Sequence, residues 1–350
     1  MKWGILGAGN IAGRFVKDLL LDDSEHKHKI VAIGSSSVEK AKKFSEANGI
    51  VAEKNQGVLP QFQEKSDFFK NPDVEIVYVA TPHVFHEEQV LEALKNRKHV
   101  LCEKPFTVTG EQARRVFKAA EKAGVFVMEG VWTRFIPAVL KAKQWVLQEK
   151  LIGDIKRCNG DFSIYLDMDT LPASSRARDI NLAAGATLDV GIYPLTYTRI
   201  FLDEKLGKNA TPFETKSFLT IDDSDKVDHV STIIVKYKDG KHGIATSSNY
   251  TAASERFLRL EGTKGTLELF GNPAAPKQAK VFDQDGNLVK EHLDKDSFDG
   301  FIHEANAAAE AVKAGKTQAD AIPWDETVLM MDTMDKIRWE NGFYYPGEKH

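Results

Sequence analysis

The chain has 350 residues and a nearly balanced charge, with 47 Lys and Arg against 51 Asp and Glu. Two cysteines cannot form a disulfide framework, and this charge balance offers no basic footprint for nucleic acid. The chain begins on a strand-like run without a secretory leader, and no apolar run is long enough to cross a bilayer. We therefore expect a cytoplasmic protein with no membrane partner, small-molecule ligands and two domains.

The N-terminal third of the chain alternates short apolar runs with amphipathic stretches. Residues 2–6, 30–34, 76–80, 99–102 and 125–128 are typical of strands, whereas residues 11–20, 38–48, 85–96 and 110–123 have helical spacing. This alternation predicts βαβ units around a parallel sheet, and therefore an α/β domain over residues 1–128.

The pattern changes in the second part of the chain, residues 129–350. A helical stretch at residues 137–150 precedes strand-length segments at residues 155–162, 232–237, 243–249, 257–262, 265–270 and 278–282. Glycine turns separate several of these segments, which predicts an α+β domain with a largely antiparallel sheet. Helical stretches at residues 302–314 and 325–341 close the chain, and we expect them to pack back against one of the domains.

A glycine-rich turn lies between the first strand and the first helix. It reads Gly7-Ala8-Gly9-Asn10-Ile11-Ala12-Gly13, a variant of the dinucleotide fingerprint. Gly7 permits a tight turn, Gly9 leaves room for a pyrophosphate, and the small Ala12 lets the helix pack close to the strand. The alternative is a plain tight turn, but the position at the first strand of a βαβ pattern favours a dinucleotide site.

The second strand ends in Ser35-Ser36-Ser37, where an NAD-binding fold normally presents an acidic residue to the ribose. Ser36 and Ser37 can instead donate hydrogen bonds to a 2′-phosphate, and Lys40 and Lys43 follow within reach. NADP is therefore the predicted cofactor. The alternative is that the serines only cap the next helix and the lysines form a solvated face.

The loop Thr81-Pro82-His83 follows another strand, and His86 comes one helical turn later. A loop at the carboxyl end of a strand should pass close to the cofactor, so contact with the nicotinamide ribose or simple helix capping is expected. The two histidines have no convincing third ligand nearby, and we expect no metal site.

The tripeptide Glu103-Lys104-Pro105 directly follows a strand-like run. An enzyme that moves a proton together with a hydride needs a polarising group near the cofactor, and Lys104 is the candidate. Glu103 is expected to contact the cofactor ribose or to position Lys104.

Four segments together resemble the glucose-fructose oxidoreductase and inositol dehydrogenase family: GILGAGNIAG at residues 4–13, ATPH at 80–83, EKP at 103–105 and TLDVGIY at 187–193. The stretch EGVWTRF at residues 129–135 and a tyrosine at position 193 are most similar to the dimeric dihydrodiol dehydrogenases and the NADP-dependent D-xylose dehydrogenases. The resemblance implies an N-terminal Rossmann domain, a C-terminal open-faced sheet that binds substrate and forms a homodimer, and catalysis without metal.

The resemblance also assigns Lys104 and Tyr193 to a catalytic pair, with Asp189 in a supporting role. A phenol titrates near pH 10 in isolation, so a nearby ammonium must lower its pKa before it acts as a base at neutral pH. Tyr193 is then expected to take the proton of the substrate hydroxyl while Lys104 holds the same oxygen. From spacing alone, Asp189 is equally a helix cap and Tyr193 a packing aromatic.

Further polar and aromatic residues are candidates for ligand contacts. Trp132 offers a flat wall to a sugar or diol, and Arg134 a donor for cofactor phosphate or substrate hydroxyls, although both can instead serve the connection between the domains. Arg176, Arg178 and Asp179 form a polar cluster in a substrate-side loop, from which Arg178 is expected to contact substrate.

The predicted function is an NADP-dependent oxidoreductase of a sugar or cyclic diol, with oxidation of D-xylose to D-xylonolactone first and a trans-dihydrodiol second. Reduction of a sugar-derived ketone is a third alternative, because the chemistry is reversible. A cofactor-binding transcriptional regulator is the alternative from a different class, since a fold alone does not fix a function. A regulator has no need for Lys104 and Tyr193, whose presence favours the enzyme.

Overall fold

The structure is a computed structural model that describes residues 1–22 and 25–348. The chain divides into two compact units. The first unit comprises Met1–Thr107, Glu111–Trp132 and Ser297–Thr327, and the second comprises Val108–Gly110, Thr133–Asp296 and Val328–His350. The first unit therefore extends four residues beyond the expected limit at residue 128 and also includes a segment from near the end of the chain.

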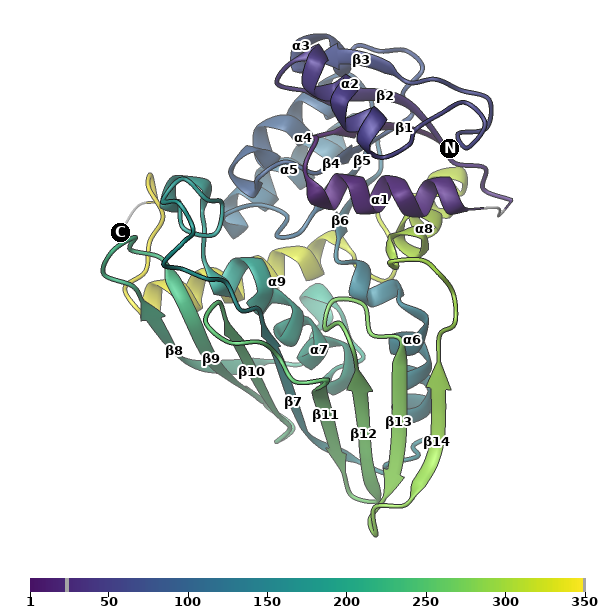
Figure 1. The fold of residues 1–350 in the computed structure, drawn as a ribbon. Helices are drawn as coiled ribbons and strands as arrows, with labels where there is room; N and C mark the ends of the chain where they lie inside the picture. Colours follow the sequence, from purple (N-terminus) through teal and green to yellow (C-terminus); the bar gives the residue numbers. More distant parts are fainter. Residues whose placement is uncertain (23–24, 349–350) are drawn as a thin grey trace. The chain divides into compact units, whose positions relative to one another are not determined.

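The first unit is built on a six-stranded parallel sheet (Figure 1). Its strands are β1 (Lys2–Leu6), β2 (Lys29–Ser35), β3 (Gln61–Glu64), β4 (Ile76–Val79), β5 (His99–Glu103) and β6 (Val127–Gly130). Their order is β3-β2-β1-β4-β5-β6, so the chain changes direction across the sheet between β1 and β4. Ligands of such sheets bind outside the carboxyl ends of the strands at this reversal.

Helices connect these strands. They are α1 (Asn10–Leu21), α2 (Val38–Ala47), α3 (Lys65–Phe68), α4 (His86–Lys95) and α5 (Gly110–Ala123), with short 3-10 turns η1 (His83–Phe85) and η2 (Trp132–Phe135). A later helix, α8 (Phe301–Lys313), also belongs to this unit. The buried Asp18 carboxylate on α1 accepts hydrogen bonds from the backbone N–H groups of Gly300 and Ile302 at 2.8 and 3.3 Å, which ties the start of α8 to α1.

The second unit contains an eight-stranded sheet in the order β14-β13-β12-β11-β7-β10-β9-β8. Its strands are β7 (Ile155–Ser163), β8 (Phe213–Ile221), β9 (Asp228–Tyr237), β10 (His242–Ser248), β11 (Arg256–Gly262), β12 (Gly265–Phe270), β13 (Gln278–Asp283) and β14 (Leu288–Leu293). β7 and β10 pair in parallel, and the other neighbours are antiparallel.

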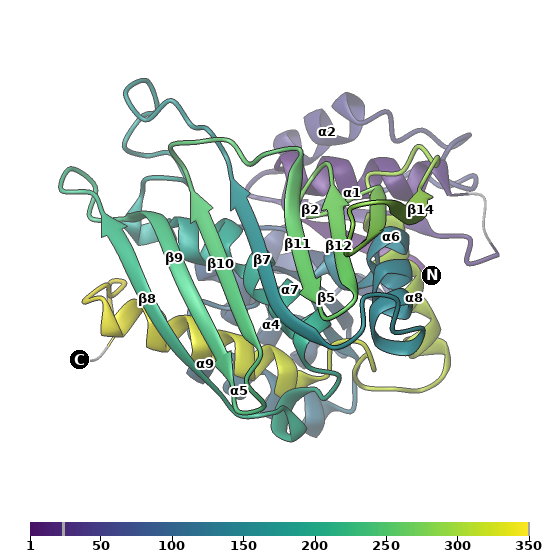
Figure 2. The same cartoon turned by 90° about the horizontal axis from the view of Figure 1, so that it is seen from below.

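Helix α7 (Ile192–Leu202) packs on β7 and β10, and Figure 2 shows these strands in front of it. The remaining elements are α6 (Pro137–Lys143), α9 (Trp324–Glu340), which begins in the first unit, the π-helical turns η3 (Gln144–Gln148) and η5 (Thr187–Gly191), and the 3-10 turns η4 (Ile180–Leu182) and η6 (Gly207–Asn209). Alternate residues of β9 are buried, whereas Ile234 is 43% exposed and Phe218 on β8 is 80% exposed. The sheet therefore keeps apolar side chains on an exposed face.

The predicted fold class is confirmed: a Rossmann-like parallel sheet with helices is followed by a mainly antiparallel sheet. The prediction omitted β3, β8 and β14, each of which lies at the edge of its sheet. Over the described ranges 1–22 and 25–348, the helices include none with the length and apolar character of a membrane span.

Candidate functional site

The fingerprint turn joins β1 to α1. Gly7 has a φ of 114° and donates its N–H to the carbonyl oxygen of Gly34 at 2.9 Å, and a Cβ at this position would lie 2.7 Å from the carbonyl oxygen of Ala80. Gly9 directly precedes α1 as its N-cap residue, and a Cβ there would meet nothing within 4 Å. The turn thus combines a position that only glycine fits with open space at the helix N-terminus, where a phosphate group is favoured.

A cavity of about 710 Å³ adjoins this turn within the first unit. Its lining includes Ala8, Gly9 and Asn10 of the fingerprint and four basic side chains, which are those of Arg14, Lys17, Lys40 and Lys43. Lys40 and Lys43 are among the residues expected from the sequence, whereas Arg14 and Lys17 are not. Their recurrence one helical turn apart on α1, after Asn10, was the available signal. Arg14 also pairs with Asp299 at 2.9 Å.

The serine loop follows β2. Ser35 is buried at the end of the strand, Ser36 is exposed, and the Ser37 side chain accepts a hydrogen bond from the backbone N–H of Lys40 at 3.2 Å. Ser37 therefore caps α2, which the capping alternative predicted. The Lys40 side chain is exposed and lines the cavity, so capping by Ser37 leaves the lysine available to a ligand.

The loop after β4 contains Thr81, Pro82 and His83. Thr81 donates its hydroxyl to Gln89 at 2.6 Å, and His83 is buried. His86 is also buried, and both of its ring nitrogens face backbone carbonyl oxygens. The His86 ring is thus directed at the protein backbone, and burial lowers its pKa.

Lys104 follows β5 as a half-buried residue whose bond to Pro105 is cis. The Glu103 side chain is buried, accepts a hydrogen bond from the Tyr78 hydroxyl and accepts the backbone N–H of Lys104 at 3.2 Å. Of the two roles predicted for Glu103, these contacts favour the positioning of Lys104.

Carboxyl groups gather behind this segment. Glu304 on α8 is fully buried, and burial together with the charges of Glu103, Asp18 and Glu129 raises its pKa well above the ordinary value. Across the described parts of the chain, no three His, Cys, Asp or Glu side chains form a group that could hold a metal ion.

Trp132 belongs to the first unit and Arg134 to the second. The Trp132 indole is buried and stacks on the Phe301 ring with 4.0 Å between centroids, and the Arg14 guanidinium lies 5.4 Å from the Trp132 ring. At 1% exposure the Trp132 indole is enclosed by protein, with the Phe301 ring stacked on it. Arg134 is buried as well.

The second unit carries Asp189 and Tyr193. Asp189 lies in η5 and pairs with Arg176 at 3.1 Å, while Tyr193 is the second residue of α7 and is 4% exposed. Pro194 follows in the first turn of α7, which continues directly from η5, so its missing N–H falls where the π-helical turn passes into the α-helix. The Tyr193 ring lies 5.0 Å from the Phe162 ring, so an aromatic surface adjoins the phenol.

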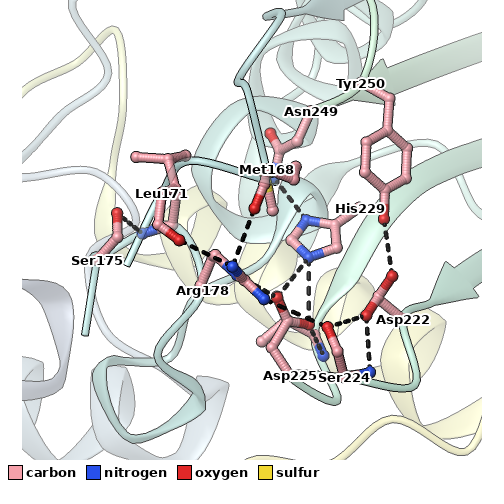
Figure 3. A network of polar contacts seen from close by, with 12 residues as sticks. Met168, Leu171, Ser175, Arg178, Asp222, Ser224, Asp225, His229, Asn249 and Tyr250 are labelled. Carbon is pink, nitrogen blue, oxygen red and sulfur yellow. Dashed lines mark hydrogen bonds and ion pairs between the residues drawn. The ribbon is translucent and has the colours of Figure 1, made fainter. Parts of the chain in front are cut away.

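Arg178 lies in the network of Figure 3. Its guanidinium donates to the carbonyl oxygens of Met168 and Leu171 at 3.0 and 2.8 Å and to Asp225 at 3.1 Å. The buried His229 bonds the same carboxylate at 3.0 Å. Arg178 thus anchors the loop after β7 to the turn before β9, and its contact with substrate stays a prediction. Asp179 similarly caps η4 by accepting the N–H of Asn181 at 2.9 Å.

Asp228 is a buried carboxylate that the sequence analysis missed. It accepts the N–H and the hydroxyl of Thr187 at 2.8 and 2.6 Å, and so holds the first residue of the segment that carries Asp189. Among the described residues, its other oxygen has no hydrogen-bond partner. Burial raises its pKa to about 6. Asp228 is the first residue of β9 and lies outside the strand expected at residues 232–237, so no pattern in the sequence marked it.

Comparisons with known proteins cover nearly the whole chain. Residues 1–131 match the oxidoreductase family with an NAD-binding Rossmann fold, and residues 139–268 match the GFO/IDH/MocA C-terminal domain. The D-xylose 1-dehydrogenase (NADP(+)) of Hypocrea jecorina is 32% identical over 99% of this chain and 93% of its own. The trans-1,2-dihydrobenzene-1,2-diol dehydrogenase of Bos taurus is 30% identical over 100% of this chain and 99% of its own.

Two solved structures share the fold. The aldose-aldose oxidoreductase of Caulobacter crescentus has a TM-score of 0.81 at 21% identity and covers 98% of this chain and 97% of its own. The 3-ketoreductase KijD10 of Actinomadura kijaniata, in complex with NADP and TDP-benzene, has a TM-score of 0.78 at 24% identity and covers 97% of each chain. The family matches and full-length relatives, together with the fingerprint turn and Lys104, lead to one conclusion: this chain is an NAD(P)-dependent oxidoreductase of the GFO/IDH/MocA family.

Proposed function

We propose that this protein is an NADP-dependent dehydrogenase that oxidises D-xylose to D-xylonolactone. The observation that carries the proposal is the 32% identity, over 99% of the chain, to a protein named D-xylose 1-dehydrogenase (NADP(+)). Each unit contributes candidates that support the proposal: a basic cavity beside the fingerprint turn and Lys104 in the first, and Asp189 and Tyr193 in the second.

The first unit fits a phosphorylated dinucleotide. Gly9 leaves open space at the N-terminus of α1, and the basic side chains around the adjoining cavity supply positive charge. In our proposal the fingerprint turn holds the pyrophosphate, and Ser36, Ser37 and Lys40 hold the 2′-phosphate. Another group of residues is proposed to contact the nicotinamide end of the cofactor. These are Thr81, Pro82, His83, Glu103, Lys104, Trp132 and Arg134.

Tyr193 acts as the base in the proposed reaction. In the proposed reaction it accepts the proton of the C1 hydroxyl of the sugar, while the ammonium of Lys104 holds the same oxygen. When bound, NADP would supply the acceptor for the hydride from C1. The C1–H bond breaks as the C1=O bond of the lactone forms. Asp189, paired with Arg176, supports the helix start that carries Tyr193.

A trans-dihydrodiol is the second candidate substrate. The observation that favours it is the Phe162 ring beside Tyr193, because a dihydrodiol presents an apolar ring face where a pyranose presents hydroxyl groups. The 30% identity to the bovine dihydrodiol dehydrogenase over 100% of the chain supports it further.

We also propose that the protein is a cytoplasmic homodimer joined through the sheet of the second unit. Phe218 and Ile234 support this assembly, because neighbouring strands present both side chains on the exposed face.

The test compares NADPH formation by purified protein with D-xylose, D-glucose and a trans-dihydrodiol, each with NADP and with NAD. The proposal requires the highest kcat/KM with D-xylose and NADP. A higher value with the dihydrodiol selects the second candidate, and a higher value with NAD for every substrate overturns the cofactor proposal.

A further inference from the structure

His86 begins α4 and is 1% exposed. Its Nε2 atom lies 2.8 Å from the carbonyl oxygen of Thr81, in the loop after β4. Its Nδ1 atom lies 3.1 Å from the carbonyl oxygen of Pro105 and 3.2 Å from that of Phe106, in the segment after β5. One imidazole ring therefore joins the two loops at the carboxyl ends of adjacent parallel strands, and the second loop follows Lys104 directly.

Side chains bind the backbone around Lys104, where the regular hydrogen bonds of the sheet end. The N–H of Lys104 donates to Glu103, and the N–H of Phe106 donates to the buried Glu129 at 3.1 Å. Glu129 in turn accepts the Thr327 hydroxyl at 2.8 Å. With His86 beside the two carbonyl oxygens, each of these backbone groups has a buried polar partner, so the path of the backbone around Lys104 is set by side chains.

A neutral imidazole carries one N–H, whereas both ring nitrogens of His86 face acceptors. His28 in the same unit shows the usual arrangement: it accepts the Trp3 indole N–H at Nδ1 and contacts the Asn306 side-chain oxygen at Nε2, at 2.9 and 2.8 Å. His86 is thus placed to bridge two loops, even though a neutral ring can donate to only one of them at a time.

We propose that His86 is a positioning residue: in one tautomer its Nδ1–H holds the segment of Lys104, Pro105 and Phe106 for catalysis, and in the other its Nε2–H holds the Thr81 loop for cofactor binding. This inference rests on the proposed function of Lys104, and it reassigns His86 from cofactor contact to backbone support. The two nitrogens thereby serve two separable properties of one enzyme.

Two substitutions separate the two sides of the ring. The amide nitrogen of asparagine occupies the place of Nδ1, and that of glutamine the place of Nε2. His86→Asn retains the link to Pro105 and Phe106, so we expect kcat within about threefold of wild type but a several-fold higher Kd for NADPH. His86→Gln retains the Thr81 link, so we expect an unchanged Kd for NADPH. We expect kcat to fall about ten- to a hundredfold, because a small displacement of Lys104 lowers the rate of the reaction by this much.

The measurements are NADPH binding by fluorescence, steady-state kcat and KM with the best substrate, and thermal unfolding. His28→Asn and His28→Gln are the matched controls, because His28 is equally buried and bonded at both nitrogens. If His86 served folding alone, both variants would lower kcat and weaken NADPH binding together, or both would leave kcat and the Kd unchanged. Each of these results overturns the inference. A wild-type protein without turnover rejects the proposed function instead, and a weaker Kd in His86→Asn alone would still support the Thr81 side.

Discussion

Basic side chains at the fingerprint turn are the residues on which the choice of cofactor depends. Arg14, Lys17, Lys40 and Lys43 line one cavity, but two of them already have acidic partners: Arg14 pairs with Asp299, and Lys43 pairs with Glu39 at 2.7 Å. Lys40 follows the serine loop directly and is exposed. It is therefore the residue at which we expect the 2′-phosphate to be distinguished from a hydroxyl.

We predict that Lys40→Ala raises the KM for NADP about tenfold and leaves the KM for NAD unchanged. The loss of one charge-assisted hydrogen bond to a phosphate group costs enough binding free energy to account for a tenfold change in KM. Steady-state kinetics with each cofactor measure it. Lys42→Ala, on the same helix but outside the cavity lining, is the control. Equal losses with both cofactors in Lys40→Ala would contradict the prediction.

Some residues of the candidate site could be predicted from the sequence, and others could not. Gly7, Gly9 and Lys104 stood out because a turn or a reaction needs those residue types at those positions. The support given by His86 and Glu129 had no comparable signal, because it depends on loops that only the folded sheet brings together. The same holds for Arg178, whose partners Met168, Leu171 and Asp225 follow from the course of a loop without periodicity.

Elements with a strong apolar pattern were predicted well. The central strands β1, β4 and β5 are almost fully buried, and so their sequences are continuous apolar runs. The omitted strands β3, β8 and β14 lie at sheet edges, bury less and carry polar or exposed residues. Hydrophobic periodicity is weak in such strands, because half of their surroundings is solvent.

The start of the η5 and α7 segment depends on Asp228. Its carboxyl pKa is about 6 in the folded state, above the ordinary value of 3.8, so the folded protein binds this proton more tightly than the unfolded chain. The contribution of Asp228 to the free energy of unfolding therefore falls as the pH rises from about 4 through 6. Asparagine keeps an acceptor for Thr187 and removes this dependence.

We predict that Asp228→Asn is as stable as wild type at pH 4 and more stable at pH 8, by on the order of 2 kcal/mol. Denaturant unfolding across this range measures the difference. Asp222→Asn is the control, for which the change in the free energy of unfolding has the opposite sign. Hydrogen bonds from Ser224 lower the Asp222 pKa to about 2, so loss of the Asp222 carboxylate should destabilise the protein above pH 4. A difference between Asp228→Asn and wild type that does not vary with pH would refute the prediction.

At the scale of the whole molecule, the exposed sheet face of the second unit is the proposed dimer surface. Phe218→Lys places a charge where an apolar contact is proposed, so we expect a monomer in sedimentation velocity at a concentration where wild type is dimeric. Leu59→Lys is the matched control, since Leu59 is also an exposed apolar residue, at 69%, but lies in the first unit. A dimer that persists in Phe218→Lys, or a monomeric wild type, would contradict this assembly.

The central claim is direct hydride transfer from a sugar carbon to NADP, supported by Lys104 and Tyr193. Its most direct test is mass analysis of the NADPH formed from D-xylose that carries deuterium at C1. The account predicts that wild type transfers the deuterium to NADPH, and that Lys104→Met and Tyr193→Phe bind NADP yet lose at least about a hundredfold in kcat. NADPH without deuterium, or variants as active as wild type, would contradict the account.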